Sequence, residues 1–180
     1  MNLPNKITIV RVIMIPIFLF FMLMPQIPAN RYIAVGIFIV ASITDAIDGY
    51  LARKNNLITN FGKFMDPLAD KLLVSSALIC FVGMNQIPIW IAFAIIAREF
   101  IISGFRLVAS DKGVVISAGL WGKLKTNVQM IMSILLIIDF DIVAFNILEQ
   151  VLIYLALAFT IISLVDYMVK NKDVLKESHN

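Results

Sequence analysis

The sequence has very few of the residues that build disulfides and charged surfaces. Of its 180 residues, one is cysteine, one is histidine and only 15% are charged. The single cysteine, Cys80, excludes an intrachain disulfide and a thiolate metal cluster, and its position in an apolar run indicates a packing role. The histidine, His179, lies in a polar tail, where we expect it to be solvated. Neither residue is a candidate for a functional site.

Apolar residues are what the sequence has in excess. They make up 61% of the chain, whereas a soluble domain has about 45–50%, and the mean hydropathy is +0.93. Hydrophobic runs near the ~20 residues that a membrane-spanning helix needs recur six times, at 7–24, 32–51, 64–83, 87–108, 120–138 and 146–169. They lack the sustained two-residue alternation of a lipid-facing barrel. We therefore predict an all-α integral membrane protein with six transmembrane helices and a single domain over residues 1–180.

A short interfacial helix is predicted ahead of the first span, because residues 2–8 hold turn and cap residues and the chain becomes apolar after Ile13. Asn5, Thr8 and Arg11 follow one another at intervals of three residues. They either anchor this helix against anionic lipid or line a pocket for a headgroup. The first apolar run is about as long as a span and no convincing cleavage site follows it, so we expect it to be retained.

The basic residues predict the orientation. If both termini are cytoplasmic, fourteen of the fifteen basic residues lie on the inner side and only Arg31 lies in an outer turn. The acidic motif described next then also faces the cytoplasm. The net charge of +3 suits anionic headgroups or anionic substrates. Nucleic acid is a poor match, because the basic residues are divided among helix ends.

Four aspartates stand close together between residues 45 and 70. Asp45 and Asp48 are three residues apart, and Asp66 and Asp70 are four apart, so on helices each pair shares a face with Cβ atoms roughly 5–6 Å apart. Bare carboxylates about 4 Å apart repel by about 4 kcal/mol per pair at an effective dielectric near 20, so the cluster holds either protons or cations. Oxygen ligands suit magnesium, manganese or calcium. We predict a two-metal site at the membrane.

A second group of candidate residues is basic. Arg98 and Arg106 are eight residues apart in the fourth run, on what we expect to be nearly the same helix face, and are predicted to bind a dianion. An alternative for Arg98 is a paired contact with Glu99 inside the bundle. Lys123 and Lys125 lie on the same membrane side, where they either anchor the fifth span or bind the anion.

Two divalent ions at a lipid-level site indicate phosphoryl chemistry on a diphosphate. A cation transporter that uses the carboxylates as its transit site is the alternative from another class. It is disfavoured because residues 90–180 contain no second acidic motif like the first.

The stretch from Asp45 to Asp70 resembles the signature of the CDP-alcohol phosphatidyltransferases, D-x-x-D-G-x-x-A-R-x8-G-x-x-x-D-x-x-x-D, at every specified position. The resemblance implies a CDP-alcohol phosphotransferase bundle, a homodimer, and displacement of CMP from a CDP-linked lipid by an alcohol, with two divalent cations, magnesium or manganese. All four aspartates would bind metal, and Asp70 would also be the catalytic base. The residues expected to bind the CDP-lipid are Asn5, Thr8, Gly49, Ala52, Arg53 and Gly62.

The flanking segments look like those of the bacterial phosphatidylglycerophosphate synthases within that family. These segments are residues 5–11, Arg98-Glu99 with Arg106, and residues 122–126. The resemblance implies an enzyme of the bacterial cell membrane that transfers a phosphatidyl group from CDP-diacylglycerol to glycerol 3-phosphate. The acceptor phosphate would bind Arg98, Arg106, Lys123 and Lys125. An inositol phosphate acceptor would need a similar pocket, whereas serine would not.

Overall fold

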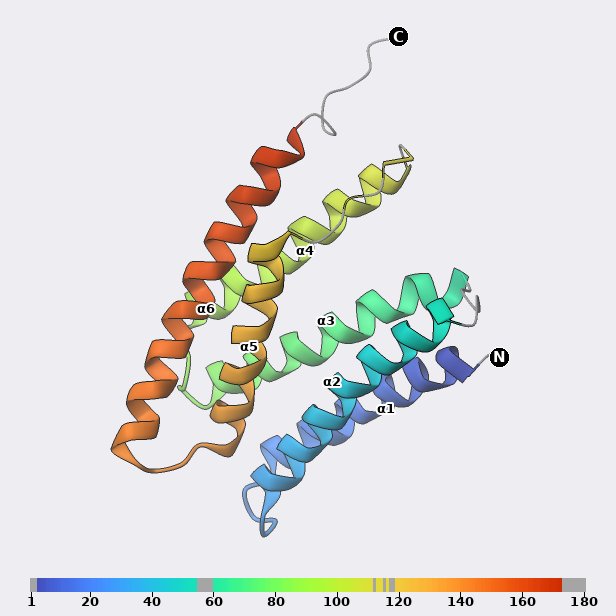
Figure 1. Cartoon of the computed structure of the whole chain (residues 1–180). Coiled ribbons are helices and arrows are strands. Elements are labelled where there is room, and N and C mark those ends of the chain that lie inside the picture. Colours follow the sequence, from blue (N-terminus) through green and yellow to red (C-terminus); the bar gives the residue numbers. More distant parts are fainter. Residues whose placement is uncertain (1–2, 55–59, 112, 115, 117–118, 173–180) are drawn as a thin grey trace. The chain divides into compact units, whose positions relative to one another are not determined.

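The computed structural model shows an all-helical chain (Figure 1). The structure describes residues 3–54, 60–111, 113–114, 116 and 119–172. Within these ranges, the side chains of residues 3–4, 45–54, 60–64 and 111 are outside the description. The regular structure in the described part consists of α1 (Leu3–Leu23), α2 (Asn30–Lys54), α3 (Asn60–Gly83), α4 (Ile89–Asp111), α5 (Leu120–Ile138) and α6 (Val143–Lys170).

The predicted helical class is confirmed, and each of the six apolar runs falls largely within one helix. Two helical segments of the described part, Asn5–Leu23 and Val143–Lys170, are long and apolar enough to cross a membrane. The prediction of six spans therefore goes further than this finding. In the described part of α2, Asn30–Thr44 forms a shorter apolar helical stretch.

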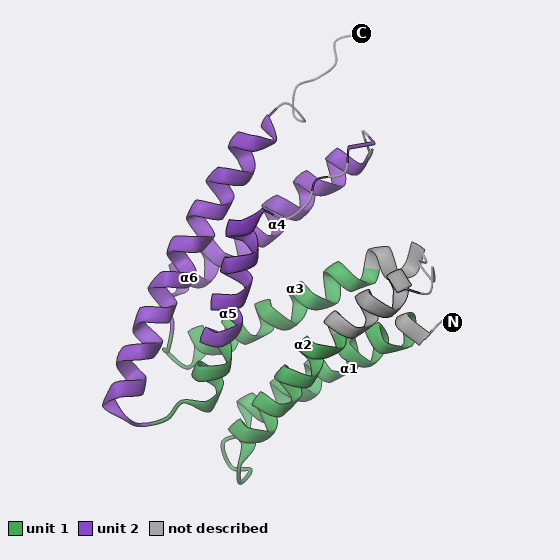
Figure 2. Ribbon diagram, in the orientation of Figure 1, with its two compact units in different colours: residues 1–86, 133–140 green, residues 87–132, 141–180 purple. Residues whose placement is uncertain are grey.

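The chain divides into two compact units, which are coloured in Figure 2. Unit 1 comprises residues 1–86 and 133–140, and unit 2 comprises residues 87–132 and 141–180. Unit 1 thus holds α1, α2, α3 and the last turns of α5, whereas unit 2 holds α4, most of α5 and α6. Each unit is described by itself below. The single domain over residues 1–180 stays a prediction.

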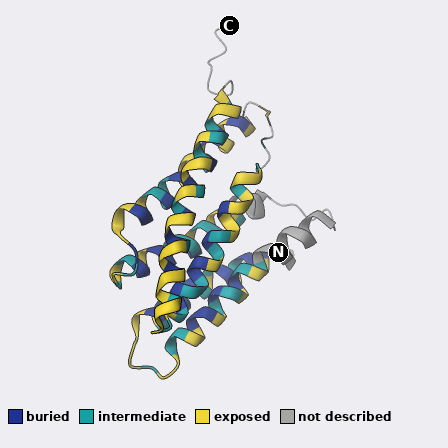
Figure 3. Ribbon diagram, turned by 60° about the vertical axis from the view of Figure 1, so that its left-hand side comes forward, coloured by how far each residue is buried: buried dark blue, intermediate teal, exposed yellow. Residues whose placement is uncertain are grey.

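Helix α1 contacts both α2 and α3 through one continuous stripe of buried residues. Toward the end of the helix the stripe is apolar and includes Phe18, whose ring centroid lies 5.8 Å from that of Phe38 on α2. Its members recur every three or four residues, as one face of an α-helix requires, and are Asn5, Thr8, Arg11, Ile15, Phe18 and Met22. Figure 3 shows that buried and exposed residues alternate along individual helices.

The predicted short interfacial helix is wrong as a separate element, because α1 runs without a break from Leu3 to Leu23. Its polar residues Asn5, Thr8 and Arg11 lie on the face that contacts α2 and α3 rather than on an exposed face. The change from polar to apolar along the sequence therefore reflects a change in what one helix face contacts. It does not mark the end of a helix.

Two side chains hold the end of α5 within unit 1. The Gln86 amide donates a hydrogen bond to the Leu136 carbonyl oxygen at 3.0 Å, and Arg31 pairs with Asp139 at 2.6 Å. In unit 2, α4 packs on α6 through a cluster of Ile102, Phe105 and Tyr167. The Phe105 and Tyr167 rings meet edge to face, with centroids 5.5 Å apart.

We expect Phe18→Ala to destabilise unit 1, because it removes a fully buried ring that packs on Phe38. Truncation of a buried phenylalanine costs about 3–5 kcal/mol of unfolding free energy. Phe20→Ala is the matched control, since Phe20 on the same helix is 50% exposed. Thermal unfolding in detergent should show a large loss for the first variant and little change for the second. Equal midpoints for the two variants would contradict the packing described here.

Candidate active site

The candidate acidic site in unit 1 includes a hydrogen bond between α1 and α3. Thr8 Oγ1 donates to Asp66 Oδ1 at 2.6 Å. Thr8 is fully buried, whereas Asp66 is partly exposed. The contact therefore links a side chain inside the helix packing to an acid that reaches solvent.

One turn further along, α1 also contacts α2 next to the first acidic pair. Arg11 Nε donates to Thr44 Oγ1 at 3.5 Å, and Thr44 directly precedes Asp45. Residues three apart on a helix have Cβ atoms roughly 5–6 Å apart. Thr8 and Arg11 therefore bring Asp66 of α3 and Thr44 of α2 to the same short stretch of α1.

The two acidic pairs lie on two helices, as the sequence predicted. Asp45 and Asp48 belong to α2, and Asp66 and Asp70 belong to α3, where both side chains are partly exposed. The side chains of Asp45 and Asp48 are outside the described residues. Among the side chains that are described, no group of three or more histidine, cysteine or acidic residues is close enough to hold a metal. The four-carboxylate cluster therefore stays a prediction.

The predicted nucleotide positions lie in three helices, α1, α2 and α3. Gly49, Ala52 and Arg53 lie in α2 and Gly62 lies in α3, but their side-chain surroundings are outside the described residues. Asn5 is 7% exposed and lies on the buried face of α1, one turn before Thr8.

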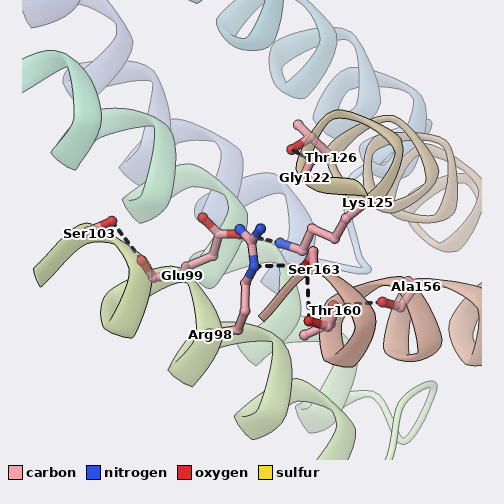
Figure 4. Close-up of polar contacts among 9 residues, drawn as sticks. All are labelled: Arg98, Glu99, Ser103, Gly122, Lys125, Thr126, Ala156, Thr160 and Ser163. Carbon is pink, nitrogen blue, oxygen red and sulfur yellow. Dashed lines mark hydrogen bonds and ion pairs between the residues drawn. The ribbon is translucent and has the colours of Figure 1, made fainter. Parts of the chain in front are cut away.

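A separate group of candidate residues forms a charged network in unit 2 (Figure 4). Arg98 Nη1 donates to Glu99 Oε1 at 2.9 Å, and Arg98 Nε donates to Ser163 Oγ at 3.1 Å. Lys125 Nζ donates to the same Glu99 oxygen. Arg98 and Lys125 are 8% and 2% exposed. The network joins α4, α5 and α6, and the three charged groups sum to one positive charge.

The backbone of α5 lies close to one arginine of this network. A Cβ atom added at Gly122 of α5 would lie 3.4 Å from Arg98 Nη2, so the backbone of α5 passes close to the guanidinium group. A glycine allows that approach because it has no side chain to displace the arginine.

The four basic residues predicted to bind the acceptor phosphate fall into two kinds. Arg98 and Lys125 are buried in the network, whereas Arg106 and Lys123 are exposed. The guanidinium carbon of Arg106 lies 5.8 Å from the centroid of the Tyr167 ring, within the range of a cation–π contact. The Tyr167 ring of α6 therefore contacts the Arg106 guanidinium group, which remains exposed at the surface.

The expectation that Arg98 and Arg106 lie on nearly the same face of one helix is wrong. Eight residues at 3.6 per turn turn the second side chain by about 80° beyond two full turns. Arg98 is accordingly buried and Arg106 exposed. The alternative role for Arg98, a contact with Glu99, is confirmed.

Sequence reasoning missed that Glu99 also binds Lys125 and that Ser163 joins the network. One signal was present, because Glu99 is the sole acid in the apolar run 87–108. A charged group at that position requires partners. The spacing within α4 does not reveal which residues of α5 and α6 supply them.

Comparison with known proteins adds independent information on the whole chain. The model of the family "CDP-alcohol phosphatidyltransferase" matches residues 1–162. The chain is 46% identical, over 99% of both chains, to the CDP-diacylglycerol–glycerol-3-phosphate 3-phosphatidyltransferase of Bacillus subtilis. It is 39% identical to the Haemophilus influenzae protein of the same name, over 93% of this chain and 91% of that one. A probable phosphatidylglycerophosphate synthase of Mycobacterium tuberculosis is 37% identical over 94% of this chain and 81% of its own.

We expect Glu99→Ala to destabilise the protein by about 3 kcal/mol, because it removes the carboxylate that two buried cations share. Lys170→Ala serves as the control, since it removes an ion pair with Asp166 in which the lysine side chain is 64% exposed. Such an exposed pair contributes about 0–1 kcal/mol. Thermal unfolding of both variants measures the difference, and a Glu99→Ala protein as stable as Lys170→Ala would contradict a structural role for the network.

Proposed function

Because this chain belongs to the CDP-alcohol phosphatidyltransferase family, we propose that it transfers the phosphatidyl group of CDP-diacylglycerol to glycerol 3-phosphate and releases CMP. The complete acidic signature and the names of its relatives support this activity. The structural observation that carries the proposal is the pair of α1 contacts, Thr8 with Asp66 and Arg11 with Thr44. These two contacts support the proposal that the two acidic pairs lie close together in unit 1.

The protein is a membrane enzyme, as its family and relatives are. We propose that its six helices all span the bacterial cell membrane, with both termini and the active site on the cytoplasmic side. Large exposed apolar side chains along the helices, among them Phe93, Leu107 and Val143, suit contact with lipid. The family resemblance also implies a homodimer, which we include in the proposal.

Asp45, Asp48, Asp66 and Asp70 would hold two divalent cations, magnesium or manganese. The donor set fits, because hard cations prefer carboxylate oxygens. Asp66 and Asp70 lie one turn apart on α3, both partly exposed, so their oxygens can reach a shared ion. Bound divalent cations would neutralise the diphosphate and stabilise the charge that develops on the departing CMP.

The chain's own residues then have distinct roles in the transfer. A hydroxyl oxygen of glycerol 3-phosphate attacks the phosphorus attached to diacylglycerol, and Asp70 accepts the hydroxyl proton. The new phosphorus–oxygen bond forms as the bond to the bridging diphosphate oxygen breaks, and its electron pair leaves with CMP. Gly49, Ala52 and Gly62 would allow the nucleotide to approach the helix backbone closely. Arg53 would offset the charge of the diphosphate, and Asn5 and Thr8 would support this end of the site.

The acceptor phosphate would bind the basic residues of unit 2. Arg106 and Lys123 are exposed and can contact a soluble dianion directly. Arg98 and Lys125 lie in the buried network, where Glu99 fixes their positions. Their part in the pocket would be to supply positive potential from below the surface, since charges interact more strongly where water is excluded.

The reaction is tested with purified protein, CDP-diacylglycerol, and magnesium or manganese. We expect CMP release with glycerol 3-phosphate but not with inositol phosphate or serine. Loss of a positioned base typically costs about 10²–10⁴-fold in rate, so Asp70→Asn should lower kcat by that factor. Asp141→Asn, which changes an exposed acid between α5 and α6, should leave kcat unchanged. Unimpaired turnover by Asp70→Asn would remove this residue from the role of base.

Arg106→Ala should weaken binding of the acceptor selectively. A hydrogen bond to a charged group is worth about 1.5–3 kcal/mol, so we expect the KM for glycerol 3-phosphate to rise about 10- to 100-fold. The KM for CDP-diacylglycerol should change little. Arg31→Ala is the control, because Arg31 pairs with Asp139 in unit 1 and is not among the basic residues of unit 2. An equal rise in both KM values of Arg106→Ala would count against phosphate binding by this residue.

A further inference from the structure

The hydroxyl group of Thr8 forms a hydrogen bond with Asp66, one of the candidate metal ligands. We propose that Thr8 is a positioning residue that orients the Asp66 carboxylate for cation binding. Thr8 Oγ1 donates to Asp66 Oδ1 at 2.6 Å. This distance is typical of a hydroxyl donating to an ionised carboxylate, which is among the stronger hydrogen bonds in proteins. The inference rests on the proposed function, because it assigns Asp66 to the metal site.

The burial of Thr8 indicates that it acts through Asp66. Thr8 is 0% exposed, so its side chain does not reach solvent, whereas Asp66 is partly exposed. A buried residue in this position is placed to act through Asp66 rather than through direct contact with a substrate. It can hold one oxygen of the carboxylate from the inner side while the rest of the group faces outward.

The direction of this hydrogen bond differs from that of the other helix hydroxyl groups whose bonds are known. Thr44 donates to Ala41, and Thr160 donates to Ala156, each to a carbonyl oxygen of its own helix. Ser103 and Thr126 do the same. A bond to the preceding turn is the usual local choice for a helical threonine. Thr8 instead bonds to an acid on another helix, which indicates a specific role for its hydroxyl group.

The consequence for cation binding follows from the geometry of a carboxylate. An ionised aspartate offers about four lone-pair sites on two oxygens, and the bond from Thr8 uses one of them. The remaining sites are then held in a fixed direction, because Thr8 is on a helix packed against both α2 and α3. Ligands held by such outer hydrogen bonds bind metals more tightly, and loss of the outer partner typically costs about 10- to 100-fold in affinity.

The experiment measures Mn²⁺ binding to the purified full-length protein without either substrate, from the electron paramagnetic resonance signal of free Mn²⁺. Thr8→Val keeps the shape of the side chain but removes the hydroxyl group. We expect it to weaken Mn²⁺ binding by about 10- to 100-fold. Thr8→Ser, which keeps the hydroxyl group, should restore binding to near the wild-type level. Thr160→Val is the matched control, since Thr160 is a buried threonine that bonds within α6.

The outcomes separate this inference from the proposed function. Wild-type protein that neither binds Mn²⁺ nor releases CMP would overturn the function itself. If Thr8→Val binds Mn²⁺ as tightly as the wild-type protein does, the positioning role alone is overturned. A Thr8→Ser variant whose Mn²⁺ affinity is as low as that of Thr8→Val would also overturn it. Thr8→Ala, which is smaller and also lacks the hydroxyl group, repeats the test if valine disturbs the fold. Thermal midpoints of all variants identify any that are unfolded.

Discussion

A charged side chain inside an apolar protein needs an opposite charge or hydrogen-bond partners, because an isolated charge in a low-dielectric environment is costly. This requirement accounts for the polar contacts that join helices in both units. In unit 2, Glu99 of α4 meets Lys125 of α5, and Arg98 meets Ser163 of α6. In unit 1, Thr8 of α1 meets Asp66 of α3. Each contact joins residues that are far apart in the sequence, so satisfying the charges also fixes which helix faces pack together.

The same requirement applies to the four aspartates of the candidate site, which stand in a chain that is 61% hydrophobic. The acids belong to the last part of α2 and the first part of α3, two helices that follow one another along the chain and are in contact. Helix α1 supplies hydroxyl and guanidinium groups to this region and apolar side chains to the rest of its buried face. One helix face thus serves as hydrogen-bonding support at one end and as hydrophobic core at the other.

Hydrophobic patterning predicted the helices well, because each apolar run is long enough to form most of one helix. Helix α2 nevertheless extends to Lys54, beyond the predicted run 32–51, since polar residues continue a helix that hydropathy alone would end. The separate interfacial helix was a wrong prediction for the same reason. The sequence pattern offered a contact between Arg98 and Glu99, which are neighbours in sequence, only as an alternative to anion binding. It could not reveal Lys125 and Ser163 as partners, because the choice of neighbouring helices is a tertiary property.

The support for Asp66 extends beyond its immediate neighbours. Thr8 occupies its position because α1 is held against α2 by contacts several turns away, among them the packing of Phe18 on Phe38. A helix is stiff over this length, so the apolar end of the stripe sets where its polar end lies. A hydrogen bond of 2.6 Å tolerates only small displacements of its donor. The orientation of a carboxylate at the candidate metal site therefore depends on hydrophobic packing that contains no functional group, which is how a rigid scaffold holds polar ligands within the narrow geometry that chemistry needs.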